Sequence, residues 1–191
     1  MQSQLAVVVA VLILLSSACA YAPRFIQNVH EVVPGKVFRS AQLGRERLTQ
    51  LIDQHGIRSV LNLRGASPGE AWYDDERATA HQNNVEHIDF ALSSKREVPP
   101  EQADELIRIM RAAPKPLLIH CWAGADRTGL ASALYLYALD DKSAEEAARA
   151  LAMKYHHFSF TSAGAMDRSF ANYVEAQSVP DRGPQPVAAS P

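Results

Sequence analysis

Apolar residues in this chain fall into short runs that alternate with segments in which they recur at helical spacing. The runs are rich in Val, Leu and Ile and are bounded by turn residues, a pattern typical of buried strands. The intervening segments repeat apolar residues three or four positions apart, as at Leu48, Leu51 and Ile52, which predicts helices with one face in the core. Strands are predicted near 36–39 and over 58–63, 85–90 and 116–120, and helices over 43–55, 70–83 and 99–113.

The second half of the chain is predicted to be mainly helical. Residues 129–139 are apolar almost all round, which is typical of a buried helix. The spacing of Ser143 and Glu146 matches a capping box at the start of another helix, and a last helix is expected over 163–176. Because strands alternate with helices, we predict an α/β sandwich in which helices flank a central, mostly parallel sheet. Functional loops of such folds lie at the carboxyl ends of the strands.

The two ends of the chain differ from the middle. Residues 1–22 carry no charged side chain, and residues 5–15 form an uninterrupted apolar run. Such a run followed by small residues is typical of a secretory signal peptide, whereas a spanning helix needs about 20 apolar residues. Lipid attachment at Cys19 and a retained N-terminal membrane anchor are the alternatives. We therefore predict a signal peptide or anchor over 1–22, one folded domain over 23–176, and a disordered tail rich in Pro, Ala and Ser over 177–191.

The composition excludes some classes of function. The chain has 191 residues, with 19 basic and 21 acidic side chains and a formal net charge of −2. Without a basic excess no nucleic-acid partner is indicated, and any attraction for an anion must be local. The only cysteines are Cys19 and Cys121, so the predicted domain has a single thiol and no internal disulfide. A lone thiol is a liability in an oxidising compartment, so Cys121 is either buried and inert or required for chemistry.

The clearest chemical pattern is the segment His120-Cys121-Trp122-Ala123-Gly124-Ala125-Asp126-Arg127-Thr128-Gly129. It follows an apolar strand and precedes an apolar helix, so unpaired backbone N–H groups at the helix N-terminus can hold an anion. Gly124 allows a tight turn and a close approach of the backbone to a bound group. The same field favours the thiolate of Cys121, and Arg127 presents a planar fork suited to two phosphate oxygens. The hydroxyl of Thr128 can donate to the sulfur.

This segment resembles the phosphate-binding loop of the protein tyrosine and dual-specificity phosphatases, in which His-Cys is followed by five residues, Arg, and Thr or Ser. Every fixed position matches, including Gly124. A more generic similarity to small bacterial dual-specificity-like enzymes extends over roughly 32–155. The resemblance implies a dual-specificity-phosphatase-like fold and a reaction in which Cys121 attacks phosphorus, a phosphocysteine forms, and water hydrolyses it. It implies no metal or other cofactor.

Other proteins also place a cysteine at such a turn. A free cysteine is most often a small buried apolar residue, but the flanking His120, Gly124 and Arg127 favour a chemical role here. Rhodanese-like sulfur-transfer loops are usually one residue shorter than the segment from Cys121 to Arg127 in this chain. Low-molecular-weight phosphatases and arsenate reductases carry their loop near the N-terminus. Both groups fit this chain less well than the dual-specificity phosphatases.

A general acid must protonate the leaving oxygen, and two residues are candidates. The resemblance implies an Asp about one strand–helix unit before the cysteine, and Asp89, at the end of its predicted strand, fits this position. The following loop, 91–98, contains no Asp. Asp126 lies beside Arg127, as in the Asp-Arg-Thr run of the myotubularin-type lipid phosphatases, where the loop Asp is proposed as the acid. Asp89 is our first candidate and Asp126 the alternative; Asp126 could instead form an ion pair that orients Arg127.

The same segment supplies the predicted substrate contacts, which are Trp122, Ala123, Gly124, Ala125, Asp126, Arg127 and Thr128. Its variable positions carry no lysine, whereas phosphatases of highly charged inositol phosphates tend to carry lysines there. A phosphorylated protein, with phosphotyrosine foremost, or a small phosphomonoester is therefore the expected partner. With the predicted leader, the protein is expected in the periplasm or cell envelope. The alternatives are a phosphatase of a lipid or inositol-type phosphate at the membrane, and a non-catalytic phosphate-binding module.

Four further side chains receive a structural interpretation. Arg39 and Arg64 could contact phosphate, but arginines at strand ends are usually solvated. The adjacent His156 and His157 do not share a helix face and have no carboxylate or thiol cluster around them in the sequence. We therefore expect surface or core roles for the two histidines and no metal site.

Overall fold

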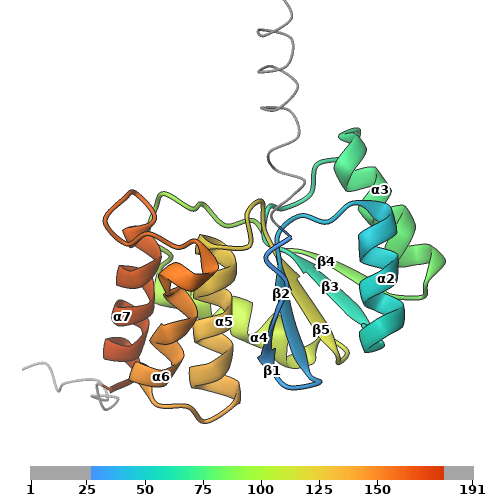
Figure 1. The fold of residues 1–191 in the computed structure, drawn as a ribbon. Helices are drawn as coiled ribbons and strands as arrows, with labels where there is room; N and C mark the ends of the chain where they lie inside the picture. Colours follow the sequence, from blue (N-terminus) through green and yellow to red (C-terminus); the bar gives the residue numbers. More distant parts are fainter. Residues whose placement is uncertain (1–26, 179–191) are drawn as a thin grey trace, which may run out of the picture.

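The computed structural model describes residues 27–178 (Figure 1). The predictions for 1–22, and for all but the first residues of the tail, lie outside the described residues. Among the helices of 27–178, none combines the length and the apolar character needed to cross a membrane. The predicted fold class is confirmed, because a mostly parallel sheet of five strands is flanked by helices.

The strands lie in the order β1-β2-β5-β3-β4. Their bounds are β1 His30–Val33, β2 Val37–Ser40, β3 Ser59–Asn62, β4 Glu86–Asp89 and β5 Leu117–His120. β1 pairs antiparallel with β2, and the remaining pairs are parallel. The last four strands agree with the predicted ones. β1 is not predicted by the apolar pattern, because its first two residues are exposed and polar.

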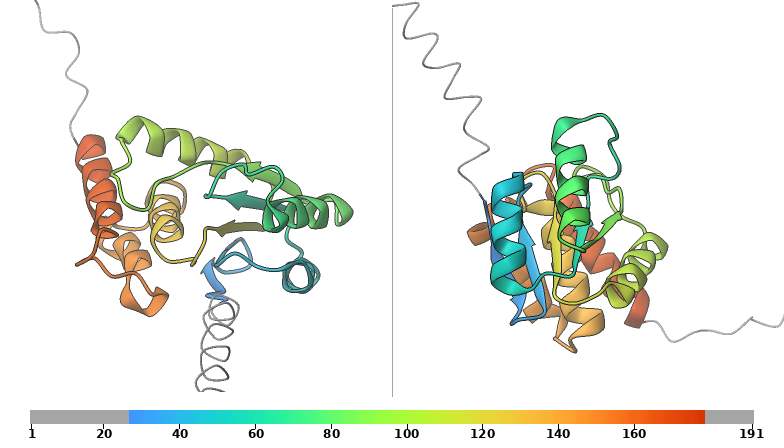
Figure 2. Two further views of the ribbon diagram at one scale, coloured as in Figure 1. Left: turned by 90° about the horizontal axis from the view of Figure 1, so that it is seen from above. Right: turned by 90° about the vertical axis from the view of Figure 1, so that its right-hand side faces the viewer.

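Helices cover both faces of the sheet, as the views in Figures 1 and 2 show. α2 (Arg45–His55) and α3 (Ala71–Gln82) lie on one face, and α4 (Pro100–Ala112), α5 (Asp126–Leu139) and α7 (Gly164–Ser178) lie on the other. Between α5 and α7 the chain forms α6 (Ala144–Ala148) and two short 3-10 helices, η1 (Arg149–Leu151) and η2 (Met153–Tyr155). The turn from β5 to α5 lies at the upper edge of the sheet in Figure 1.

Local signals in the sequence set some of the helix ends. Gly56 closes α2 in the left-handed conformation at φ 62°, and Ser143 and Glu146 form the predicted capping box of α6. α5 begins earlier than predicted, at Asp126, so part of the motif segment belongs to the helix. α7 continues to Ser178, beyond the domain end predicted at 176.

The alternation of side chains along the strands divides the core into two buried clusters. Leu61 and Ile119 pack with α4, α5 and α7, whereas Leu118 packs with α2 and α3. Cys121, two positions after Ile119, continues the cluster of α4 and α5. His120, two positions after Leu118, hydrogen-bonds to a side chain of α3. This division decides which side chains can meet at the carboxyl end of β5.

Candidate active site

The turn between β5 and α5 carries the predicted nucleophile. The side chain of Cys121 is buried, with 3% of its surface exposed. The backbone N–H of Leu63 donates to the carbonyl of His120 at 2.9 Å, and that of Gln42 donates to the carbonyl of Trp122 at 3.1 Å. Because these donors follow β3 and β2, the start of the loop is attached to the strands on both sides of β5.

Two buried side chains hold the carbonyl groups of the loop. Asn28 Nδ2 donates to the carbonyls of Ala123 and Gly124, each at 3.0 Å. Arg39 Nη2 donates to the carbonyls of Gly124 and Ala125 at 2.9 and 3.1 Å. In a trans peptide the N–H points opposite to the C=O, so the N–H groups that follow these carbonyls point away from Asn28 and Arg39. Such a set of free N–H groups forms an anion-binding turn.

Arg39 is neither solvated nor a phosphate ligand, in contrast to both interpretations of its sequence position. Only 1% of its surface is exposed, and its Nη1 donates to the carbonyl of Ala150 at 2.8 Å. Desolvation lowers the pKa of the guanidinium to about 10, which leaves the group charged at neutral pH. Arg39 is therefore an internal brace between β2, the loop and η1.

Gly124 has no room for a side chain. Its φ is +66°, and a Cβ at this position would lie 2.5 Å from the backbone N of Ala41 and 2.5 Å from the carbonyl carbon of Ser40. Both contacts are with backbone at the end of β2, which cannot move aside as a flexible side chain can. The glycine predicted from the motif is therefore required both by conformation and by space.

Arg127 and Thr128 carry buried donors at the first turn of α5. Arg127 Nη1 makes two long contacts of 3.4 Å, to the carbonyls of Leu63 and Leu92. Within residues 27–178, the Nε of Arg127 and the hydroxyl of Thr128 are buried and have no hydrogen-bond partner. A buried donor without an acceptor costs about 1–3 kcal/mol, so this cation and this hydroxyl are arranged to receive an anion.

A buried polar network supports the loop from the α3 face. Glu76 Oε1 accepts hydrogen bonds from His120 Nε2 at 3.0 Å and from His87 Nε2 at 2.9 Å, and Gln42 donates to Glu76 Oε2. Burial alone would raise the pKa of Glu76, but His120 and the hydrogen bonds from His120, His87 and Gln42 hold it well below its usual range. The carboxylate therefore stays ionised and fixes the ring that precedes Cys121.

Asp89 ends β4 as predicted, but its carboxylate is directed to α3. Asp89 Oδ1 accepts from Asn62 Nδ2 at 2.8 Å, and Oδ2 accepts from the hydroxyl of Tyr73 at 2.5 Å. Burial, and then the hydrogen bond to Asp89, raise the pKa of Tyr73 to about 12. The register pairs Asp89 with Asn62 and Asn62 with His120, so Asp89 lies two strands from β5 and on the face of His120. Cys121 packs in the buried cluster of the other face.

Asp126, the alternative acid, is the first residue of α5. Its Oδ1 lies 2.8 Å from Nδ1 of His157, whose Nε2 lies 2.8 Å from Oδ2 of Asp167. His157 is fully buried, so it has the core role that was one of the two expected for it, and its ring hydrogen-bonds to Asp126 and Asp167. The described residues contain no ion pair between Asp126 and Arg127, so the orienting pair considered for Asp126 is not formed. Within 27–178 no group of three or more His, Cys, Asp or Glu side chains is placed to hold a metal ion.

A comparison with known protein families finds a match over residues 24–148, to the model of the tyrosine phosphatase family. The chain belongs to the tyrosine phosphatase family. The family predicted from residues 120–129 is thus confirmed. A comparison of this phosphatase with curated proteins finds no match.

Several solved structures share the fold of this phosphatase. TpbA of P. aeruginosa superimposes with a TM-score of 0.61 at 19% identity, over 79% of this chain and 91% of that chain. A Cys-to-Ser variant of TpbA in complex with phosphotyrosine superimposes with a TM-score of 0.60 at 20% identity, over 80% of this chain and 92% of that chain. The core catalytic domain of the PP-IP phosphatase SIW14 from S. cerevisiae, in complex with citrate, has a TM-score of 0.54 at 18% identity. The match covers 79% of this chain and 90% of that chain. At these identities the likeness concerns the fold alone.

Proposed function

We propose that the protein hydrolyses phosphate monoesters at the turn between β5 and α5, through a phosphocysteine intermediate on Cys121. Membership of the tyrosine phosphatase family supports phosphatase activity. The observation that carries the proposal is that the buried thiol shares this turn with buried donors of Arg127 and Thr128 that have no partner within 27–178. Donors in a dry site, aimed at a charge that develops in the reaction, are a main source of rate enhancement.

The reaction needs only groups of this chain and one water molecule. The loop N–H groups and Arg127 bind the non-bridging oxygens of the phosphate. The thiolate of Cys121 attacks phosphorus, an S–P bond forms, the bond to the leaving oxygen breaks, and the general acid protonates that oxygen. Water then attacks the phosphocysteine and gives a proton to the carboxylate left by the general acid, the S–P bond breaks, and inorganic phosphate leaves. The hydroxyl of Thr128 stabilises the thiolate by donating to it in both steps.

We assign the general acid to Asp126 rather than to Asp89. Asp126 is the first residue of α5, directly after the loop, with one oxygen held by His157, and its Oδ2 has no hydrogen bond to residues 27–178. Both oxygens of Asp89 already accept hydrogen bonds from Asn62 and Tyr73, on the face of the sheet opposite to Cys121. A carboxyl directly after the loop can reach the leaving oxygen without crossing the sheet, which is the first requirement for a general acid.

Phosphotyrosine is the substrate that the loop favours. The indole of Trp122, with 55% of the residue's surface exposed, provides a flat apolar surface next to the nucleophile for an aryl ring. The variable loop positions carry no lysine, which disfavours highly charged phosphates. The TpbA complex with phosphotyrosine supports the same choice, and the PP-IP phosphatase SIW14 supports an inositol-type phosphate as the alternative. Export to the periplasm or cell envelope by residues 1–22 is part of the same proposal.

The proposal is tested by turnover of p-nitrophenyl phosphate by the full chain in chelator and reductant. Wild-type protein is expected to be active, and Cys121→Ser to be inactive because its hydroxyl is a far weaker nucleophile at neutral pH. Thermal melts of both proteins control for folding. Activity that survives in Cys121→Ser would refute the cysteine mechanism, and phosphate binding without turnover in the wild type would favour the binding-module alternative.

The assignment of the acid is tested by comparing Asp126→Asn with Asp89→Asn on two substrates. General acid catalysis contributes about 10²–10⁴-fold, and more when the leaving group is poor. We therefore expect Asp126→Asn to lose far more activity on phenyl phosphate than on p-nitrophenyl phosphate, and Asp89→Asn to lose similar factors on both. The opposite pattern would return the role to Asp89.

A further inference from the structure

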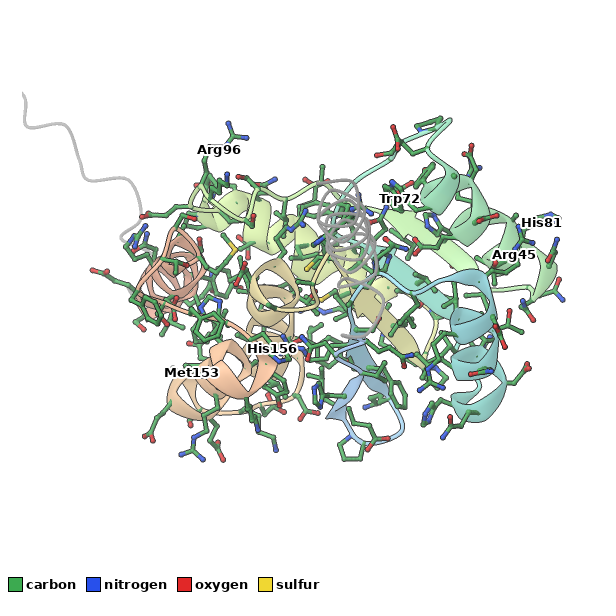
Figure 3. All side chains as sticks on the ribbon, turned by 45° about the horizontal axis from the view of Figure 1, so that its top comes forward. Arg45, Trp72, His81, Arg96, Met153 and His156 are labelled. Atoms are coloured by element: carbon green, nitrogen blue, oxygen red, sulfur yellow. The ribbon has the colours of Figure 1, made fainter. Side chains whose placement is uncertain are left out.

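A cleft of about 710 Å³ opens beside the phosphate-binding loop. It lies between the N-terminal ends of α2 and α3. Trp122, the residue that follows Cys121 in the sequence, is part of its lining. Trp72 of α3 and Arg64, which follows β3, also line it. Figure 3 labels Trp72 and Arg45, which lie on the side of the molecule that α2 and α3 form. Of its lining, the substrate binding proposed above uses only Trp122.

Arg64 is held in the cleft by two indoles. Its guanidinium carbon lies 3.5 Å from the ring centroid of Trp72 and 4.9 Å from that of Trp122. Nη1 donates to Gln42 Oε1 at 3.2 Å, which is the one hydrogen bond that the side chain makes with residues 27–178. Stacking leaves the edge of the guanidinium free while fixing its plane, so little side-chain entropy is lost when a ligand binds to that edge.

The charges around Arg64 leave it available for an anion. Burial, and then the nearby guanidinium of Arg127, lower the pKa of Arg64. Neither arginine forms an ion pair with a carboxylate of the described residues, whereas Arg45, also in the cleft, is paired with Asp75. The negative charges of Glu76, Cys121 and Glu70 act on the pKa of Arg64 in the opposite direction and offset part of the repulsion from Arg127. An anion that binds between or beside the two guanidinium groups relieves the repulsion further.

We propose that this cleft binds a second anionic group of the substrate, the carboxylate of an acidic residue next to phosphotyrosine in a peptide. The proposal rests on the proposed function, because it concerns the group attached to the phosphate that Arg127 holds. The edge of Arg64 can bind a carboxylate through two parallel hydrogen bonds. The indoles of Trp72 and Trp122 can pack against the peptide around it.

The lining of the cleft favours a peptide over a compact polyphosphate. The carboxylates of Glu46 and Asp75 line the cleft together with its arginines and would repel a dense negative charge. Leu43 and Ala71 add apolar surface for the peptide. A volume of about 710 Å³ lies within the roughly 300–1,000 Å³ of ligand pockets and exceeds what one phosphate fills.

The test is a double-mutant cycle between the full-length protein and its substrate. Two phosphotyrosine peptides differ only in Glu or Gln next to the phosphotyrosine, and kcat/KM is measured for wild type, Arg64→Gln and Arg64→Lys. Wild type is expected to prefer the Glu peptide by about tenfold, because a hydrogen bond between charged groups contributes that much. Arg64→Gln should reduce this ratio to about one, with Arg64→Lys between them. Arg108→Gln, on α4 and with a side chain 71% exposed, should keep the wild-type ratio.

The same measurements separate the two proposals. Turnover of p-nitrophenyl phosphate by the wild type tests the phosphatase function alone, so its absence is a failure of that function. With turnover present, an equal loss by Arg64→Gln on both peptides and on p-nitrophenyl phosphate would place Arg64 on the reacting phosphate and overturn the second subsite. A ratio near one in the wild type would also overturn it. Discrimination between a sugar bisphosphate and its monophosphate, lost in Arg64→Gln while the peptides show none, would replace the peptide by a small bisphosphate.

Discussion

Replacing Arg39 by methionine removes the brace that holds the loop carbonyls. Methionine fills a comparable buried volume but offers no donor. The three carbonyl groups of Gly124, Ala125 and Ala150 then lose the guanidinium. Because the loop N–H groups are directed by these carbonyls, the substitution should affect both the stability of the fold and the anion-binding turn.

The magnitude follows from two opposing contributions. Each hydrogen bond from a charged donor contributes about 1.5–3 kcal/mol, which favours the wild type. Burial of the guanidinium, visible in the pKa of Arg39 lowered to about 10, offsets part of this gain. Leaving a buried carbonyl without its donor costs about 1–3 kcal/mol, a sizeable part of the roughly 5–15 kcal/mol that stabilises a domain. A shift of the loop by about 1 Å would lower turnover by about a hundredfold.

Urea unfolding and turnover of p-nitrophenyl phosphate measure the two effects. Arg39→Met should unfold at a clearly lower urea concentration and lose turnover, and Arg39→Lys should lie between it and the wild type because lysine cannot reach all the carbonyls. Arg108→Met, at an exposed position of α4, serves as the control and should match the wild type. An Arg39→Met protein with wild-type stability and turnover would refute the bracing argument.

Two further substitutions test the loop and its support. Gly124→Ala places a methyl group 2.5 Å from backbone atoms of Ala41 and Ser40 and should abolish turnover. Gly35→Ala, at a similar φ of +64° but with nothing within 4 Å of the added methyl group, should lower folding stability by about 1 kcal/mol and leave turnover intact. Equal effects of the two substitutions on turnover would contradict the steric argument. Glu76→Gln should destabilise the fold most above about pH 5. The pKa of Glu76 is lower in the folded state than in the unfolded chain, where it is about 4.3, so the ionised carboxylate stabilises the fold above that pH. This contribution is lost as the pH falls. A difference in urea midpoint from the wild type that stays constant between pH 7 and pH 3 would contradict the role of the ionised carboxylate.

Much of the fold is predictable because local pattern and burial coincide. β3 and β5 are buried on both faces, with Val60 and Leu61 at the centre of β3 and Leu117 to Ile119 in β5 supplying the apolar signal. α5 is apolar almost all round because it packs against β5, α4, α6 and α7. β1 is the exception, since a half-exposed edge strand needs no apolar run. The strand–turn–helix form of the motif segment is equally predictable, because its ten residues are contiguous in the sequence.

The supporting residues are not predictable because their contacts join distant parts of the chain. Asn28, Arg39 and Glu76 look like solvated polar residues, and only the folded sheet brings them to the loop. The place of Asp89 depends on the register between β3 and β4, which turns its carboxylate to the face of α3. His157 reaches Asp126 from the segment between η2 and α7, and no spacing in the sequence indicates that contact.

The cysteine mechanism requires a covalent intermediate at Cys121, and trapping that intermediate tests the mechanism most directly. Full-length wild-type protein is mixed with p-nitrophenyl phosphate, quenched within the first turnovers, and examined by intact mass and by peptide mapping that preserves the thiophosphate bond. The cysteine mechanism predicts a wild-type protein that is heavier by one phosphoryl group, which is attached to Cys121. The Cys121→Ser variant should carry no such group. A phosphoryl group on another residue, or turnover with no phosphorylated enzyme under conditions in which its hydrolysis limits the rate, would contradict it.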